Sequence, residues 1–402
     1  MYRLWAGEYV HGQLLALCVI LSAVAAAVLR AISVKRLEPH EDVLLDYESI
    51  DAARAAVFSN PDRPHQLTVV LRQISSAARL TGGAILGLCL ALTSWSGIGI
   101  ARGAAVFAVA AVCLVAPSVV ARRPIVREYA RVRGIPVRAL RRPGRVRGGA
   151  IQLAILGWPT AVALAAMHRV GAQIAVLVIG YLVVDPLLGA LLMPLTVRIV
   201  APQVASDAVS LRVQQLAAEA HVKMRRPRIV RSRERRLANA LQVGWLPGLK
   251  YILIYDYLVD EMSAPQLDAI IAHELAHARL RHVTFRTLIS WILITAAALI
   301  LVDVVSGWQN EIVTLGGFAV VLLAGRYLRS LALRQETAAD DFAARIAGPP
   351  ALASALERLT ELNALSANTS AKWDRQVGHP GMAKRIARLR AQELAAMPTV
   401  PS

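Results

Sequence analysis

This sequence of 402 residues is poor in charge, in cysteine and in aromatic side chains. Only 18% of the residues are charged while 56% are hydrophobic, so the chain is too apolar for an ordinary soluble domain and is typical of a polytopic membrane protein. The three cysteines, Cys18, Cys89 and Cys113, all lie inside apolar runs. This placement argues against a disulfide framework and against a thiolate metal site.

Acidic residues are also scarce, with 27 Asp and Glu against 45 Lys and Arg, which gives a net charge of +18. The basic residues fall mainly between apolar stretches, with little aromatic interleaving, and this pattern argues against a nucleic-acid partner. The segment 122–148 holds ten arginines and a single acid, Glu128. Under the positive-inside rule it is a cytoplasmic loop, which could also bind anionic lipid headgroups.

Seven apolar runs predict membrane-spanning helices, five before residue 200 and two after residue 284. They cover about residues 13–34, 80–101, 103–121, 149–167, 171–197, 285–305 and 312–324. The first run could be a signal peptide, but its length and Glu8 favour a retained anchor. Counting outward from the arginine-rich loop places the amino terminus outside and the segments after residue 197 and after residue 324 in the cytoplasm. Asp185, beside Pro186, is either a polar partner within the helix bundle or a helix cap.

A small α+β domain is predicted to begin near residue 201. Residues 206–220 have helical spacing, and 227–230, 237–243 and 251–255 have the character of short strands. Ser263 and Gln266 then form a capping box, with Pro265 in the first turn, so a helix is expected to begin at this point.

That helix carries the motif HExxH, as His273, Glu274 and His277. Imidazoles at positions i and i+4 lie about 5–6 Å apart at Cβ, which lets both bind one zinc ion. The carboxylate of Glu274 is then placed to act as a general base. By itself the pentapeptide could also be two solvated histidines on a helix surface, and the flanking sequence must decide.

A catalytic zinc ion needs a third protein ligand. Metzincins supply a histidine at the position held here by Val283, and no carboxylate follows the motif before Asp303, which belongs with Glu311 to a predicted external turn. The first carboxylate back on the cytoplasmic side is Glu336, which is therefore the predicted third ligand. Asp340 lies one helical turn further on and is placed to accept the second ring N–H of a zinc-binding histidine.

These motifs resemble those of the integral-membrane gluzincin peptidases, the family that includes the heat-shock protease HtpX and the CAAX prenyl protease. The resemblance covers about residues 201–389 and rests on Asn239-Ala240, His273-Glu274-Leu275-Ala276-His277 with His282, Glu336-Thr337-Ala338-Ala339-Asp340, and His379-Pro380 with Arg385-Ile386. Five spans before the motif and two after it look more like the CAAX prenyl protease. The motif departs from many members in having Ala276 in place of glycine.

The resemblance implies further roles. Asn239 and Ala240 would belong to an edge strand that binds an extended substrate by β-augmentation. His379 and Arg385 would lie near the metal and stabilise the oxyanion, although a helix start at His379 and a surface salt bridge at Arg385 are an equal alternative. His282 is expected to be a polar surface residue or a partner of a ligand, because three ligands are already assigned.

The predicted architecture is mainly α-helical, with a membrane domain at 1–200, a zincin domain divided into 201–284 and 330–402, and a transmembrane hairpin at 285–329 between its parts. The predicted function is a membrane endopeptidase with one zinc ion per chain, which cleaves membrane-associated or misfolded proteins at the cytoplasmic face. A signal-transducing protease with one cytoplasmic substrate and a CAAX-type processing peptidase are the alternatives. A channel or scaffold with a structural metal is disfavoured, because such sites usually have four ligands.

Overall fold

The computed structural model describes residues 20–35, scattered positions between 66 and 77, and residues 119–136, 187–293, 311–365 and 380–396. The chain divides into two compact units, Met1–Arg141 and Arg142–Ser402. In the first unit, helices at 20–35 and 119–132 contribute to a small apolar core. Its buried members are Leu29, Leu67, Ile74, Ala121 and Ile125.

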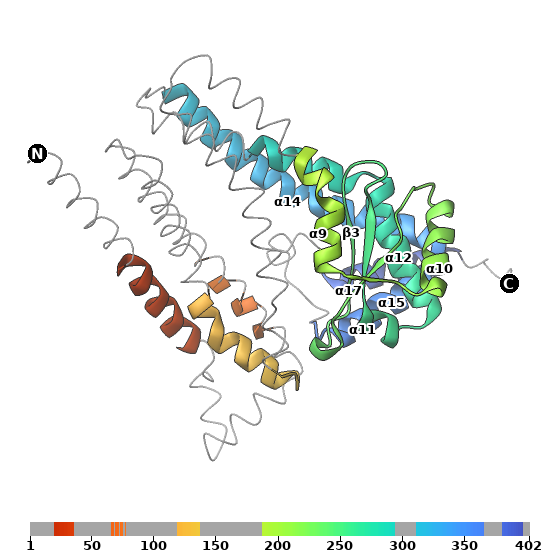
Figure 1. Ribbon diagram of the computed structural model, residues 1–402, viewed down its shortest axis with the longest axis horizontal. Helices are drawn as coiled ribbons and strands as arrows, with labels where there is room; N and C mark the ends of the chain where they lie inside the picture. The colour runs from red at the N-terminus through yellow and green to blue at the C-terminus, as the bar shows by residue number, and fades with distance from the viewer. Residues whose placement is uncertain are drawn as a thin grey trace, which may run out of the picture. The chain divides into compact units, whose positions relative to one another are not determined.

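The second unit is mainly helical with one small sheet (Figure 1). Its elements are α9 (Met193–Val200), β1 (Gln203–Val204), α10 (Asp207–Glu219), β2 (Arg228–Val230), η1 (Arg233–Arg235), β3 (Ala240–Val243), β4 (Tyr251–Tyr255), α11 (Asp256–Glu261), α12 (Ala264–Arg279), α14 (Glu311–Ala347), α15 (Pro349–Leu362) and α17 (Met382–Ala396). The predicted strands at 227–230 and 251–255 are confirmed, and the one predicted at 237–243 begins at Ala240.

The four strands lie in the order β1-β2-β4-β3. The central strand β4 pairs in parallel with β2 and antiparallel with β3, so β3 is an edge strand. Because side chains alternate along β4, its two faces enter different cores. Ile252 and Ile254 pack with the core of α12, while Tyr251 and Leu253 pack with Val197 of α9.

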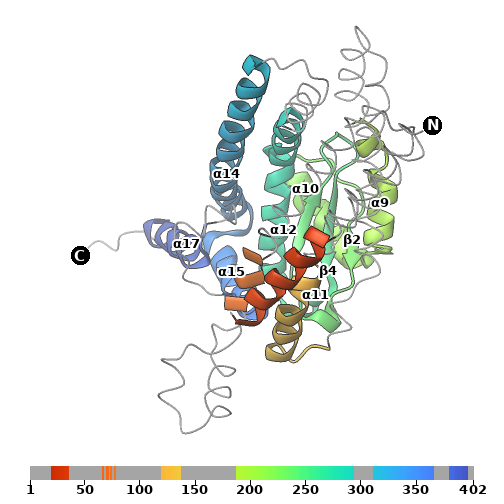
Figure 2. The same cartoon turned by 90° about the vertical axis from the view of Figure 1, so that its left-hand side faces the viewer.

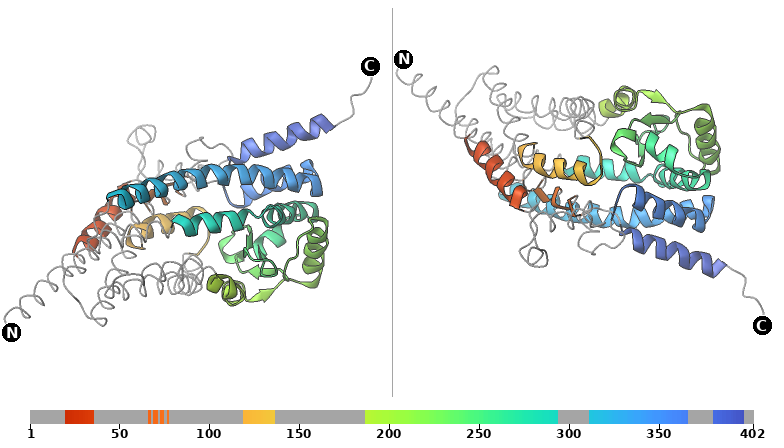
Figure 3. Two further views of the ribbon diagram at one scale, coloured as in Figure 1. Left: turned by 90° about the horizontal axis from the view of Figure 1, so that it is seen from above. Right: turned by 90° about the horizontal axis from the view of Figure 1, so that it is seen from below.

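Helices α12 and α14 pack against each other more extensively than any other pair of elements described in the second unit. They run side by side for part of their length (Figures 2 and 3). Buried alanines, among them Ala272 and Ala276 on α12 and Ala339 and Ala343 on α14, leave room for a close approach. Helix α15 covers α12, and α17 packs on α15 and α14. This packing places α17 beside α14 and α15, two helices that both contact the HExxH helix.

No helix within the described residues combines the length and the apolar character of a membrane span. The predicted spans near 80–101, 103–121, 149–167 and 171–197 lie wholly or largely outside those residues, and the span at 285–305 does so beyond residue 293. The seven spans and the four predicted segments of the chain therefore stay predictions.

Candidate metal centre

Helix α12 holds both histidines of the HExxH motif on one face. The helix begins as predicted, with the Ser263 N–H donating to Oε1 of Gln266 at 3.1 Å in a complete capping box, and with Pro265 in the first turn. Its face toward the core is apolar, with Ile271 and Leu275 fully buried. Since these residues fix the rotation of the helix, His273 and His277 are directed toward α14.

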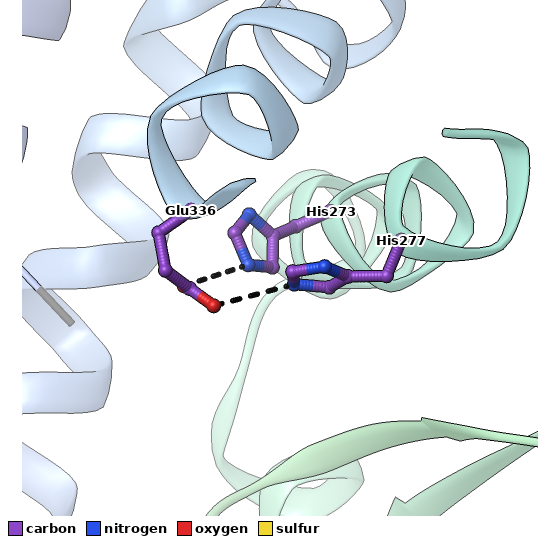
Figure 4. Close-up of side chains that lie close together, drawn as sticks. All are labelled: His273, His277 and Glu336. Atoms are coloured by element: carbon purple, nitrogen blue, oxygen red, sulfur yellow. Dashed lines mark ion pairs between the residues drawn. The ribbon is translucent and has the colours of Figure 1, made fainter. Parts of the chain in front are cut away.

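Glu336 on α14 completes a cluster of three possible metal ligands (Figure 4). Its two carboxylate oxygens lie 3.5 Å from Nε2 of His273 and 3.5 Å from Nε2 of His277. One ligand atom from each residue falls within 4.8 Å of the other two, and all three side chains are largely buried. His277 and Glu336, which are 59 positions apart in the sequence, therefore meet at one point.

Asp340 lies one turn beyond Glu336 and is fully buried. Its Oδ1 is 3.0 Å from Nδ1 of His273, the ring nitrogen that faces away from Glu336. On its other side, Arg385 of α17 donates from Nε at 2.8 Å and from Nη2 at 2.6 Å. Arg388 adds a contact at 3.4 Å. Asp340 thus links the first histidine of the motif to two arginines near the end of the chain.

This network sets the charge of the site. Burial lowers the pKa of His273, but the carboxylates of Asp340 and Glu336 outweigh it and raise that pKa to about 9. Burial and the neighbouring His273 lower the pKa of His277 to about 3. Burial works against ionised Asp340, yet Arg385 and His273 hold its pKa well below its usual range. The two histidines of one motif are therefore electrostatically unlike.

Glu274 is held by the edge strand of the sheet. Its Oε2 accepts the backbone N–H of Gln242 at 2.7 Å. Because Asn239 accepts the N–H of Tyr255 at 3.0 Å, the backbone of residues 239, 241 and 243 faces β4, while that of Ala240 and Gln242 faces the open edge. The carboxylate therefore lies at the outer side of β3.

Asn239 and Ala240 also lie at this edge. The Asn239 Oδ1 accepts the N–H of Ala240 at 3.0 Å. One step earlier, the side chain of Asn363 bonds to both backbone groups of Ala238, accepting at 3.0 Å and donating at 2.8 Å. The outward N–H groups of residues 238, 240 and 242 thus each have a side-chain acceptor.

Arg385 and His379 were predicted to lie near the metal. Arg385 is only 6% exposed and bonds to Asp340, so its salt bridge is buried and not at the surface. His379 lies outside the described residues. His282 was expected to be a surface residue or a partner of a ligand, and it contacts His277. The sequence assigned no role to Gln242 or Asn363. Only the position of His282, five residues after His277, drew attention to it in the sequence. The Gln242 bond has no sequence signal, because a backbone N–H makes it.

The cluster fits a zinc ion. Two imidazoles and one carboxylate form a donor set that catalytic zinc sites use, with a fourth position left for water or substrate. Nδ1 of each histidine has a neighbour, Asp340 for His273 and His282 for His277, which leaves Nε2 directed into the cluster. Such outer contacts are what orient metal-binding histidines.

Comparison with known proteins shows what the region around this cluster resembles. Residues 205–393 match peptidase family M48. Protease HtpX homolog 2 of Methanosarcina acetivorans is 29% identical over 138 residues, which are 32% of this chain and 47% of that protein, so the match spans about half of the relative. A protease HtpX homolog of Acaryochloris marina is 32% identical over 39% of this chain and 57% of its own length. Protease HtpX of Shewanella sp. is 29% identical over 45% and 72%.

A solved structure gives a wider likeness in fold. The crystal structure of S. mikatae Ste24p aligns with a TM-score of 0.60, at 15% identity, over 92% of this chain and 98% of that one. The predicted resemblance to HtpX and the CAAX prenyl protease is therefore confirmed at the level of family. The part of the chain that holds the cluster, residues 205–393, is thus similar to peptidase family M48.

Proposed function

We propose that this protein is a zinc-dependent endopeptidase that acts on membrane-associated or misfolded proteins. The observation that carries the proposal is the convergence of His273, His277 and Glu336, with Glu274 on the same helix and bonded to the edge strand. The match to peptidase family M48 supports it. His273, His277 and Glu336 would hold the zinc ion.

When bound, zinc would polarise the scissile carbonyl and acidify the attacking water. Glu274 takes the proton of that water and passes it to the leaving amine. The bond from the Gln242 N–H fixes this carboxylate at the outer edge of β3. A substrate strand added along Ala240 and Gln242 would pass beside the general base, which brings the reacting groups together.

The mutation Glu274→Gln tests the catalytic proposal. The amide keeps the size of the side chain and cannot accept a proton, so cleavage of an unfolded protein should fall by about 10²–10⁴ while zinc content stays at one ion per chain. Glu219→Gln, at the exposed end of α10, is the matched control and should cleave normally. Equal cleavage by Glu274→Gln and the wild type would refute the proposal.

We also propose that the chain crosses the cell membrane several times, with the M48 domain on the cytoplasmic side. The support is the set of seven apolar runs and the arginine-rich segment 122–148. Reporter fusions after residues 148 and 402 should both report a cytoplasmic location, and a fusion after residue 308 an external one. A cytoplasmic signal from the third fusion would contradict this topology. Binding of anionic lipids at 122–148 is testable with vesicles that contain or lack phosphatidylglycerol.

The substrate class can be tested with the same variant. An inactive Glu274→Gln protein should retain uncleaved substrates, so proteins that accumulate with it in membranes, relative to the wild type, identify the class. Many unrelated unfolded membrane proteins would support quality control. A single regulator or prenylated peptide would redirect the proposal to one of the two alternatives.

A further inference from the structure

His282 lies against the second histidine of the motif. Its Nδ1 is 2.9 Å from Nδ1 of His277, and the side chain is only 6% exposed. The opposite nitrogen of His277, Nε2, is 3.5 Å from Glu336. His282 therefore contacts the back of the ring whose front faces the candidate metal centre, and it stands to His277 as Asp340 stands to His273.

A local break in the backbone makes this contact. Residues five apart on a continuous helix point about 140° away from each other, which would direct His282 away from His277. Instead α12 ends at Arg279, Arg281 adopts a left-handed conformation with φ 55°, and a second helical segment begins at His282. A left-handed non-glycine residue is strained, and such strain is retained where the surrounding structure requires it.

The chemistry of the pair assigns its protons. Nε2 of His277 can offer a lone pair to a metal only if Nδ1 carries the hydrogen. That hydrogen needs an acceptor, and the atom 2.9 Å away is Nδ1 of His282. His282 must then be neutral and carry its own hydrogen on Nε2. It is not a fourth ligand in this arrangement, because the nitrogen that it presents already accepts from His277.

We propose that His282 is a positioning residue, which fixes the ring orientation and the tautomer of His277 for zinc binding. The inference rests on the proposed function, since it takes the cluster to be a zinc site. A neutral imidazole adds no charge beside His277, unlike the carboxylate behind His273. The two motif histidines are thus held by different partners. Asp340 comes from α14, whereas His282 follows His277 in the same segment of chain.

The test is the zinc affinity of the full-length protein, measured by competition with a chelator and without any substrate. His282→Phe keeps the ring volume and removes the acceptor, so zinc binding should weaken about 10- to 100-fold. His282→Asn offers an oxygen acceptor and should recover part of that loss. His221→Ala is a matched control, because His221 is a histidine that also follows the end of a helix but is exposed, and this variant should bind zinc normally.

The outcomes are decisive for His282 independently of catalysis. Wild-type zinc affinity in His282→Phe would overturn the proposal, and so would equal losses in the Phe and Asn variants, which would show that packing alone matters. A wild-type protein that binds zinc but cleaves nothing would refute the proposed function and leave the role of His282 in place. At saturating zinc, His282→Phe should regain most of its cleavage rate with unchanged KM, whereas Glu274→Gln should not.

Discussion

The candidate metal centre has two sides that are built by different physical means. On the helix side, α14 and α17 place a buried ion-pair network behind His273, in which Asp340 bonds to Arg385. On the strand side, β3 holds Glu274 through the backbone N–H of Gln242, and the hairpin turn depends on glycine. Charge orients His273, whereas backbone geometry orients Glu274. Mutation of Arg385 on the helix side should therefore mainly lower the free energy of unfolding, whereas mutation of Gln242 on the strand side should mainly lower the rate of cleavage.

The largest effect is expected on the helix side, from Arg385→Met. The change leaves the fully buried Asp340 without its bidentate partner, and breaking a buried pair in this way costs about 3–5 kcal/mol of unfolding free energy. Urea unfolding of the purified chain measures it. The control is Arg390→Met, on the same helix as Arg385, which breaks an exposed pair with Glu357 of α15. It should leave stability unchanged within error.

Double substitution separates the roles of Arg385. If the arginine acts by holding Asp340, then Asp340→Asn should recover much of the stability lost in Arg385→Met, because the uncompensated charge is gone. If Arg385 instead stabilises an oxyanion, stability would recover but the cleavage rate of the double variant would stay as low as that of Arg385→Met with zinc fully bound.

A smaller loss of stability is expected on the strand side, from Gly244→Ala. A Cβ at this position would lie 2.1 Å from the Leu249 carbonyl oxygen, and φ is +88°, so the hairpin must shift at a cost of about 1–3 kcal/mol. Gly248→Ala has a similar φ of +77° but open space around it, and should cost only about 1 kcal/mol. Thermal unfolding of both variants compares them, and equal stabilities would show that the close contact does not matter.

Gln242→Pro should reduce activity more than stability. The substitution removes the N–H that bonds to Glu274, and because this N–H faces the open edge no ladder bond to β4 is lost. We expect the rate of cleavage to fall about tenfold with zinc content unchanged, through a less well positioned base. Gln242→Ala keeps the N–H and is the control. A similar rate for the two variants would show that the bond to Glu274 is dispensable.

The smallest effect is expected far from both sides, at the pair that joins α10 to α12. Arg212 donates to Asp268 at 2.9 Å and 2.8 Å, but the arginine is 46% exposed. Arg212→Ala should cost about 0.2–1 kcal/mol in urea unfolding and nothing in zinc affinity. A loss as large as that of Arg385→Met would mean that burial is not what separates the two ion pairs.

Residues whose positions follow from helical periodicity were predictable. Ser263 and Gln266 indicated where α12 begins, and the spacing of His273 and His277 placed both on one face of it. Glu336 was predicted as the first carboxylate after the two later apolar runs, and it does lie beside both histidines, with Asp340 one helical turn further on. These predictions need only local helix geometry and a count of the predicted membrane spans.

Contacts made by backbone groups, or after a break in a helix, were not predictable. The Gln242 N–H that holds Glu274 has no signature in the side-chain sequence. His282 reaches His277 only because Arg281 is left-handed. Arg385 was expected near an oxyanion or at the surface, and its buried bonds to Asp340 depend on how α17 packs against α14.

Residue types and composition were enough to predict a helix bearing two imidazoles and a carboxylate, a distant candidate third ligand, and a membrane-like chain. These follow from residue types and from periods of 3.6 that any helix imposes. Packing between distant segments settles which groups hold these side chains, namely Asp340 with Arg385, His282, and the edge of β3. Hydrogen bonds of about 3 Å depend on packing between segments far apart in the chain, and the sequence pattern alone does not encode such distances.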